Sequence, residues 1–90
     1  MSISAHLMPL DDVLVGGEAT LVAPANAMRI HLIVVNNSTG VGVRCGDKTV
    51  HAKRGARLAP SSTRDIQTRG PVYMASEGDP VWISVTDDIR

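Results

Sequence analysis

Met28-Arg-Ile-His-Leu-Ile-Val-Val35 is the stretch of sequence that decides the fold. In a β-strand its alternate residues lie on opposite faces, with Met28, Ile30, Leu32 and Val34 on one face and Arg29, His31, Ile33 and Val35 on the other. Its β-branched side chains favour a strand over a helix. The second face becomes apolar toward Val35, so we expect a central strand that is covered on both sides there.

Short strands separated by turn residues continue this pattern along the chain. Asn36-Asn-Ser-Thr-Gly40 has the composition of a turn, and the alternating residues 41–45 follow it, so a β-hairpin is expected. Further strand candidates are residues 13–15, 20–22, 49–51, 64–68, 72–75 and 81–85, with glycine and proline between most of them. Roughly six to eight short strands predict an all-β fold, a small antiparallel β-sandwich or barrel.

A chain of 90 residues can form only one hydrophobic core, so we expect a single domain. Residues 1–12 contain Pro9 and scattered apolar positions, which predicts an extended N-terminal arm followed by a single sandwich domain over residues 13–90. The chain has no Phe, one Tyr and one Trp, so the core must be built from aliphatic side chains. The small stabilisation left after backbone ordering favours association with identical copies or with a larger partner.

The charges are unevenly distributed although the formal net charge is zero. Eight of the nine basic residues lie between Arg29 and Arg69, where only two acids occur, and the other acids lie outside that stretch. If the fold keeps these groups apart, one copy carries a positive and a negative patch, which suits contacts between copies. A solvated mosaic of charges is the alternative.

Cys45 is the only cysteine, which excludes an internal disulfide and favours assembly in a reducing compartment. Neither a membrane-spanning apolar run nor a cleaved secretory signal is expected from the sequence.

Glycine-rich segments do not predict a nucleotide site. Gly40-Val-Gly-Val-Arg-Cys-Gly46 follows a strand, but no helical period comes after it to supply the helix end that binds a phosphate. Gly46-Asp-Lys-Thr49 resembles the end of a phosphate-binding loop, but its aspartate would repel phosphate. Turn formation explains both segments, so we expect no cofactor.

Histidine, cysteine and serine positions do not predict a metal or catalytic centre. His6, His31, His51 and Cys45 lack the spacing of paired metal ligands. A hydrolytic triad of Ser61 or Ser62 with His31 and Asp65 lacks the sharp turn that exposes a nucleophile. We therefore expect neither a metal nor catalytic residues.

Three features are candidates for binding a partner. The densest basic spot, Lys53 and Arg54 with Arg57, favours an acidic protein over nucleic acid because no aromatic residue stands beside it; a solvated loop is the alternative. Trp82 alternates with Val81, Ile83 and Val85, so it points outward as an interface residue unless the arm or another sheet covers it. The apolar arm residues would add a strand to a neighbouring copy, or belong to a disordered tail. These arm residues are Ile3, Leu7, Met8 and Leu10.

Four segments occur in a fixed order: Val34-Val-Asn-Asn-Ser-Thr-Gly-Val-Gly-Val-Arg-Cys-Gly-Asp47, Arg57-Leu-Ala-Pro-Ser-Ser62, Gly70-Pro-Val-Tyr-Met-Ala-Ser76 and Val81-Trp-Ile-Ser-Val85. This succession resembles small β-rich virion proteins of tailed bacteriophages. In those sequences an Asn-rich turn precedes a V-x-V-x-x-G-D segment, an L-A-P-G-x-S corner, a G-x-V-Y-A-x-S strand and a terminal V-x-V strand. The chain departs from the pattern at Ser61, where glycine is usual, and in its basic residues 53–57.

The resemblance implies a non-enzymatic structural protein of the virion. The expected role is that of a capsid decoration or cement protein, which is assembled in the host cytoplasm, binds the outer surface of the head and bridges neighbouring shell subunits. Its partners would be the major capsid protein or another virion protein, together with further copies of itself. A neck or tail accessory protein, a carbohydrate- or host-surface-binding module, and a small enzyme with a polar pocket around His31 or His51 are the alternatives.

Overall fold

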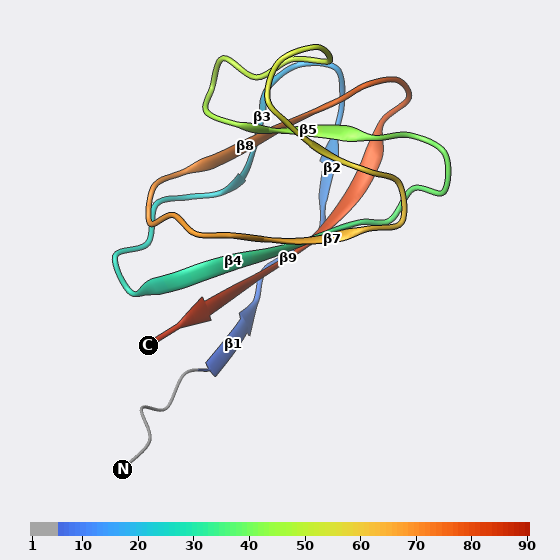
Figure 1. Cartoon of the computed structure of the whole chain (residues 1–90). Coiled ribbons are helices and arrows are strands. Elements are labelled where there is room, and N and C mark those ends of the chain that lie inside the picture. Colours follow the sequence, from blue (N-terminus) through green and yellow to red (C-terminus); the bar gives the residue numbers. More distant parts are fainter. Residues whose placement is uncertain (1–5) are drawn as a thin grey trace.

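A computed structural model describes residues 6–90 and confirms an all-β fold (Figure 1). The strands are β1 (His6–Pro9), β2 (Val13–Val15), β3 (Thr20–Ala23), β4 (Arg29–Asn36), β5 (Val43–Gly46), β6 (Ala56–Leu58), β7 (Thr63–Ile66), β8 (Val72–Ser76) and β9 (Val81–Ile89). Within this range no helix is long and apolar enough to cross a membrane.

Two antiparallel sheets pack on each other as a sandwich. We call them sheet A, with strand order β1-β9-β4-β7 and β2 also paired to β9, and sheet B, with order β3-β8-β5-β6. In Figure 1 the long strands of sheet A form the lower layer, and β3, β5 and β8 of sheet B lie above them. Connections therefore pass repeatedly from one layer to the other.

The core lies between the sheets and is built from aliphatic and sulfur-containing side chains. Period-two alternation produces it directly: in β9 the residues Val81, Ile83 and Val85 are buried and point toward sheet B. The remaining buried members of the core are Val15, Val22, Ala23, Leu32, Val34, Val43, Cys45, Leu58, Val72 and Met74. Within residues 6–90 this core therefore contains no aromatic ring.

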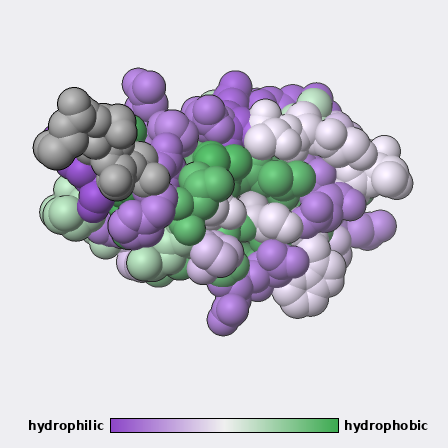
Figure 2. All heavy atoms as spheres, turned by 90° about the horizontal axis from the view of Figure 1, so that it is seen from below, coloured by the Kyte–Doolittle hydropathy of each residue, from purple (hydrophilic) through white to green (hydrophobic). Residues whose placement is uncertain are grey.

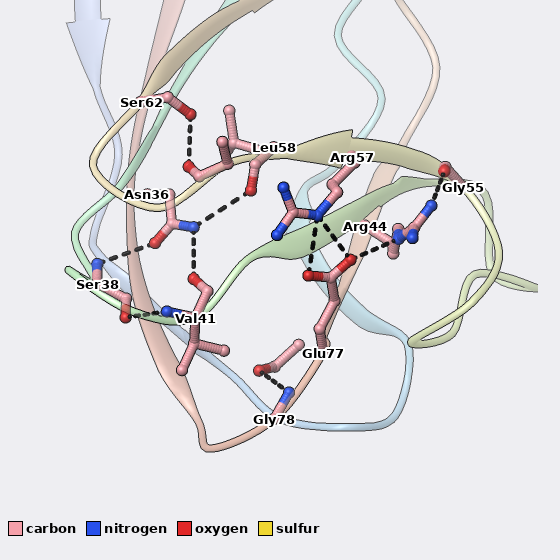
Figure 3. Close-up of polar contacts among 12 residues, drawn as sticks. Asn36, Ser38, Val41, Arg44, Gly55, Arg57, Leu58, Ser62, Glu77 and Gly78 are labelled. Carbon is pink, nitrogen blue, oxygen red and sulfur yellow. Dashed lines mark hydrogen bonds and ion pairs between the residues drawn. The ribbon is translucent and has the colours of Figure 1, made fainter.

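The expected hairpin between residues 28–35 and 41–45 is wrong. β4 pairs with β9 and β7, so both of its edges are occupied, and β5 pairs with β6 and β8 in the other sheet. The buried side chain of Asn36 shapes the crossing (Figure 3): its Nδ2 donates to the carbonyl oxygens of Val41 at 2.9 Å and Leu58 at 3.3 Å, and its Oδ1 accepts from the amide of Ser38 at 2.9 Å.

The start of β4 also differs from the expected alternation. Met28 and Ile30 are 56% and 40% exposed, whereas Arg29 is 1% exposed. The reason is a bulge between Arg29 and His31, where one extra residue of β4 stands opposite the end of β9. This extra residue reverses the alternation, so the guanidinium of Arg29 points between the sheets.

The described part of the expected N-terminal arm is extended and belongs to sheet A. β1 pairs with the second half of β9, and the amide of Leu10 donates to the carbonyl oxygen of Val85 at 2.9 Å. All four residues of β1 are exposed, and Figure 1 shows the strand at the lower margin of the molecule. Ile3 lies outside the described residues.

Two further segments differ in extent from the sequence prediction. β9 continues to Ile89, four residues beyond the expected end, because β1 and β4 pair with its second half. The expected strand at residues 49–51 is reduced to a single bridge between His51 and Arg54 inside the β5–β6 loop.

Gly55 holds the end of this loop, and we expect Gly55→Ala to lower the free energy of unfolding by about 2–3 kcal/mol. Its φ is +125°, and a Cβ there would lie 2.7 Å from both the carbonyl oxygen of Cys45 and Cγ2 of Val50. Urea unfolding measures the change. Gly16→Ala is the control, because no atom lies within 4 Å of the added Cβ; equal losses in both variants would contradict the prediction.

Candidate functional site

The outer face of sheet A carries apolar side chains that the strand alternation leaves outside the core. Since Leu32 and Val34 point inward from β4, Ile33 and Val35 point outward, and both are half-buried. In β9 the outward residues are Trp82, Ser84 and Thr86. No other layer of residues 6–90 covers this face, because sheet B lies on the opposite side.

Leu14 and Trp82 form a cross-strand pair at one end of this face. They are Cα partners in the pairing of β2 with β9, and they are 47% and 54% exposed. Of the two alternatives open for Trp82, the structure has the outward one. Seen from below, the face carries a green apolar band across its middle (Figure 2). Neighbouring aromatic and aliphatic side chains of this kind are typical of the centres of protein interfaces.

The strand pairing places three hydroxyl groups and three ionisable side chains on the same face, those of Thr63, Ser84, Thr86, His31, Asp65 and Asp88. The Nδ2 of Asn37 donates to Oγ of Ser84 at 2.8 Å. The only ion pair on this face within residues 6–90 joins Nε2 of His31 and Oδ2 of Asp88 at 3.2 Å. Asp65 of β7, the Cα partner of Ile33, is an exposed charge beside the centre of the face, so a docked partner has to leave this carboxylate in water or pair it.

The outer face of sheet B is charged along β5 and β6, and its exposed apolar residue, Leu21, pairs with Tyr73 on β3 and β8. Nε of Arg44 lies 2.8 Å from Oε2 of Glu77, and Nε of Arg57 lies 3.0 Å from Oε1 of the same carboxylate (Figure 3). The adjacent positions of Arg44 and Arg57 on β5 and β6 explain how two guanidinium groups share one acid. Arg57, which the sequence suggested for partner binding, thus forms an ion pair within its own chain.

The other two members of the basic spot lie in the β5–β6 loop. His51 and Arg54 exchange backbone hydrogen bonds of 3.2 and 2.9 Å, and the amide of Lys53 donates to Nδ1 of His51 at 3.2 Å. Lys53 and Arg54 are exposed. The structure therefore separates the spot into one arginine with an acidic partner and two residues on the tip of a loop, and an acidic protein as their partner stays a prediction.

The ion-paired carboxylate predicts an acid-dependent part of the stability. Burial raises the pKa of Glu77, but the hydrogen bonds and charges of Arg44 and Arg57 outweigh it, so the pKa lies below its ordinary value of 4.5. A depressed pKa means that the carboxylate form is favoured in the folded state. The stabilisation from this ionised carboxylate is complete when the pH is above the ordinary pKa of the unfolded chain. It is lost as the pH falls through the lower pKa of the folded state.

We accordingly expect Glu77→Gln to lose less stability than the native chain when urea unfolding is repeated at progressively lower pH below 4.5. Glu18→Gln is the control, because Glu18 forms no ion pair within residues 6–90. An identical pH dependence for native chain and Glu77→Gln would contradict the assignment.

A hollow of about 650 Å³ opens at the side of the sandwich between β7 and β5. Its lining comes from both sheets and includes Cys45, Ala56, Arg64, Ile66 and Val72. Burial raises the pKa of the Cys45 thiol to about 11, although Arg64 acts in the other direction. A thiol with such a pKa is almost fully protonated at neutral pH, so it is a poor nucleophile.

The residues considered for a hydrolytic triad are not brought together. Ser61 and Ser62 donate through their hydroxyl groups to the carbonyl oxygens of Ser38 at 3.1 Å and Ala59 at 2.5 Å. The amide of Asn36 donates to Ser62, which places this corner at the opposite end of β4 from His31. In the described part of the chain, no three histidine, cysteine or acidic residues form a metal-binding group.

The segment Gly46-Asp-Lys-Thr49 forms a turn. Oδ1 of Asp47 accepts hydrogen bonds from the amide of Thr49 at 2.8 Å and from its hydroxyl at 2.5 Å. These bonds lower the pKa of Asp47, with the side-chain bond the larger cause. The carboxylate thus organises the loop that carries Lys53 and Arg54.

The sequence did not predict the buried ion pair between Arg29 and Asp87, which lies where β4 begins and β9 ends. Nε of Arg29 donates to Oδ1 of Asp87 at 2.6 Å, and the rest of the guanidinium donates to the carbonyl oxygens of Gly70 at 2.8 Å, Pro24 at 2.6 Å and Thr68 at 3.3 Å. Within residues 6–90, no buried side-chain nitrogen or oxygen lacks a partner. The pair joins β4 and β9 to two loops and is structural.

No protein-family model matches the chain, and none of the curated proteins or solved structures compared with it is significantly similar. The functional argument therefore rests on the residues themselves.

Proposed function

We propose that this chain is a non-enzymatic structural protein of a phage particle, a capsid decoration or cement protein that lies on the outer surface of the head and bridges neighbouring shell subunits. The observation that carries the proposal is the exposed apolar face of sheet A, with Leu14 and Trp82 at one end and Ile33 and Val35 at its centre. This face would dock on the major capsid protein or on another virion protein.

Docking is favourable if burial of the apolar side chains of this face lowers the free energy by more than covering its polar groups raises it. Each fully buried large apolar side chain contributes about 1.5–3 kcal/mol, and an aromatic residue at the centre of an interface often contributes more. The neighbouring hydroxyl groups can keep hydrogen bonds with a partner or with water. Because a shell presents many identical sites, contacts that are individually weak still hold copies that touch two subunits at once.

The four segments that resemble small virion proteins support the same class. In this fold they contain β5, β8 and the first half of β9 with the turns beside them, and Ser61, which replaces the usual glycine, has a φ of +56°. That left-handed backbone conformation is the one in which glycine is favoured. The departure from the pattern therefore keeps the backbone geometry that the glycine would give.

Rebinding to particles tests the proposal. Under it, a phage genome encodes the chain, and particles assembled with the gene deleted should take up the purified protein until the shell sites are filled, with the label spread over the whole head. Label confined to the neck or tail would place the protein there instead. Failure to bind such particles, combined with binding of the isolated domain to glycans or turnover of a small substrate, would overturn the proposal.

A further inference from the structure

Sheet A ends in two edges that carry no further strand within residues 6–90, β1 on one side and β7 on the other. All neighbours in the sheet are antiparallel, so strand direction alternates from β1 through β9 and β4 to β7. With four strands in the order, β1 and β7 run in opposite directions. A second copy placed beside β7 in the same orientation would continue the alternation with its own β1.

The backbone groups at the β7 edge can be assigned from the pairing with β4. The amide of Asn36 donates to the carbonyl oxygen of Ser62 at 2.9 Å, and hydrogen-bonded pairs alternate along an antiparallel ladder. Ser62, Arg64 and Ile66 therefore direct their backbone groups to β4, whereas Thr63 and Asp65 direct theirs outward. Gln67, one residue beyond the end of β7, is the next outward position. The hollow lies next to this edge, on the side of the sheet that faces sheet B.

The same reasoning assigns the free groups of β1. The amide of Leu10 bonds to Val85, so Leu10 and Met8 direct their backbone groups to β9. Leu7 then presents its N–H and carbonyl at the free edge, and Pro9 presents its carbonyl only. The side chain of Met8 lies on the same side of the sheet as buried Asp87, yet it is 45% exposed.

We propose that copies of this chain associate through sheet A, with β1 of one copy added to β7 of the next and Met8 seated in the hollow beside Cys45. Placing Met8 opposite Ile66 lets Leu7 exchange two backbone hydrogen bonds with Gln67 and lets the carbonyl of Pro9 accept from the amide of Asp65. The missing N–H of Pro9 then leaves only one bond unmade.

Opposite charges beside β1 and on β7 favour a second copy of the chain as the partner at the β7 edge. Asp11 and Asp12 are exposed directly after β1 at its free edge, and Arg64 is exposed on β7. None of the three forms an ion pair within residues 6–90. In the proposed register Leu10 stands opposite Arg64, so the two aspartates that follow Leu10 lie close to the guanidinium of the neighbouring copy.

Such an association is head-to-tail, so it closes into a ring or continues as a row of copies. It follows from the sheet edges alone and needs no particle; on the shell of the proposed function it would supply the contacts between neighbouring copies. Its test is therefore made in solution, where failure leaves the proposed function untouched.

Site-directed cross-linking of two single-cysteine variants tests the register. Leu7→Cys and Gln67→Cys, each with Cys45→Ala, replace exposed residues that become a hydrogen-bonded pair with Cα atoms about 5.5 Å apart, a distance that allows a disulfide. Mixed and oxidised with diamide, the two variants should form heterodimers whose disulfide joins positions 7 and 67, identified by peptide mass spectrometry. If Cys45→Ala lowers the yield of folded protein, the native cysteine is kept, since its buried thiol reacts slowly.

The control partner is Leu21→Cys, which replaces an exposed residue on the outer face of sheet B. The heterodimer of Leu7→Cys with Gln67→Cys should form in about tenfold or greater excess over the heterodimer of Leu7→Cys with Leu21→Cys and over either homodimer. Arg64→Asp should reduce its yield, and Asp12→Arg combined with Arg64→Asp should restore it. Equal yields for all pairs, or a predominance of the Leu7→Cys homodimer, would overturn the proposal.

Discussion

Replacement of Arg29 by methionine is expected to lower the free energy of unfolding by about 3–5 kcal/mol. The variant leaves the buried carboxylate of Asp87 with only a 3.3 Å hydrogen bond from Asn26, and it removes the donor from the carbonyl oxygens of Pro24 and Gly70. Each buried group left without a partner is costly. In a domain of this size the melting temperature should fall by more than about 10 °C.

Two matched variants separate the buried pair from ordinary charge removal. Arg69→Met removes an exposed arginine whose Nε donates only a 3.3 Å hydrogen bond to the backbone carbonyl of Arg29, and it should change the stability by less than about 1 kcal/mol. Asp87→Leu added to Arg29→Met should recover part of the loss, because it removes the unpaired charge. A loss for Arg29→Met no larger than for Arg69→Met would contradict this account of the network.

Trp82→Ala is expected to weaken binding to particles by about 30-fold or more, which corresponds to about 2 kcal/mol for the loss of a large aromatic side chain that a partner buries. The indole is 54% exposed and lies opposite Leu14 on the docking face, so its removal should leave the fold intact. Occupancy of gene-deleted particles as a function of protein concentration measures the effect, and circular dichroism checks the fold.

Leu21→Ala is the control for this effect, because Leu21 is similarly exposed at 44% but lies on sheet B. It should bind particles like the native chain. If Trp82→Ala binds normally, or if Leu21→Ala is weakened as much, the outer face of sheet A is not the docking surface.

The all-β architecture was predictable because alternation is a local property of the sequence. Val81, Ile83 and Val85 are buried as the pattern predicts, and the same alternation placed Trp82 outside. Its cross-strand partner Leu14 was not predictable, since the register between β2 and β9 depends on pairing across most of the chain. The face proposed for docking could therefore be assembled only from the structure.

Two errors in the predicted fold have a common cause: strands that are distant in the sequence pair with β4. A turn of favourable composition follows β4, but β7 and β9 occupy both of its edges, so the next strand joins the other sheet. The bulge beside Arg29 likewise depends on β9, where Asp87 supplies the buried partner that makes an inward guanidinium favourable. The pairing of β4 with these two strands cannot be predicted from residues 28–35 alone.

The basic spot illustrates what the sequence could not resolve about the site. Arg57, Lys53 and Arg54 are close in sequence, but only the pairing of β5 with β8 brings Glu77 to Arg57 and Arg44. One of the three basic residues therefore pairs with an acid from another strand, and the other two lie exposed in the β5–β6 loop.

The copy number of the chain on purified particles tests the central claim most directly. Quantitative mass spectrometry against the major capsid protein gives this number without any assumption about the docking surface. A decoration protein bound across the shell should be present in hundreds of copies, because capsid symmetry repeats its site. A count of about a dozen or fewer, or absence from the particle, would contradict the account.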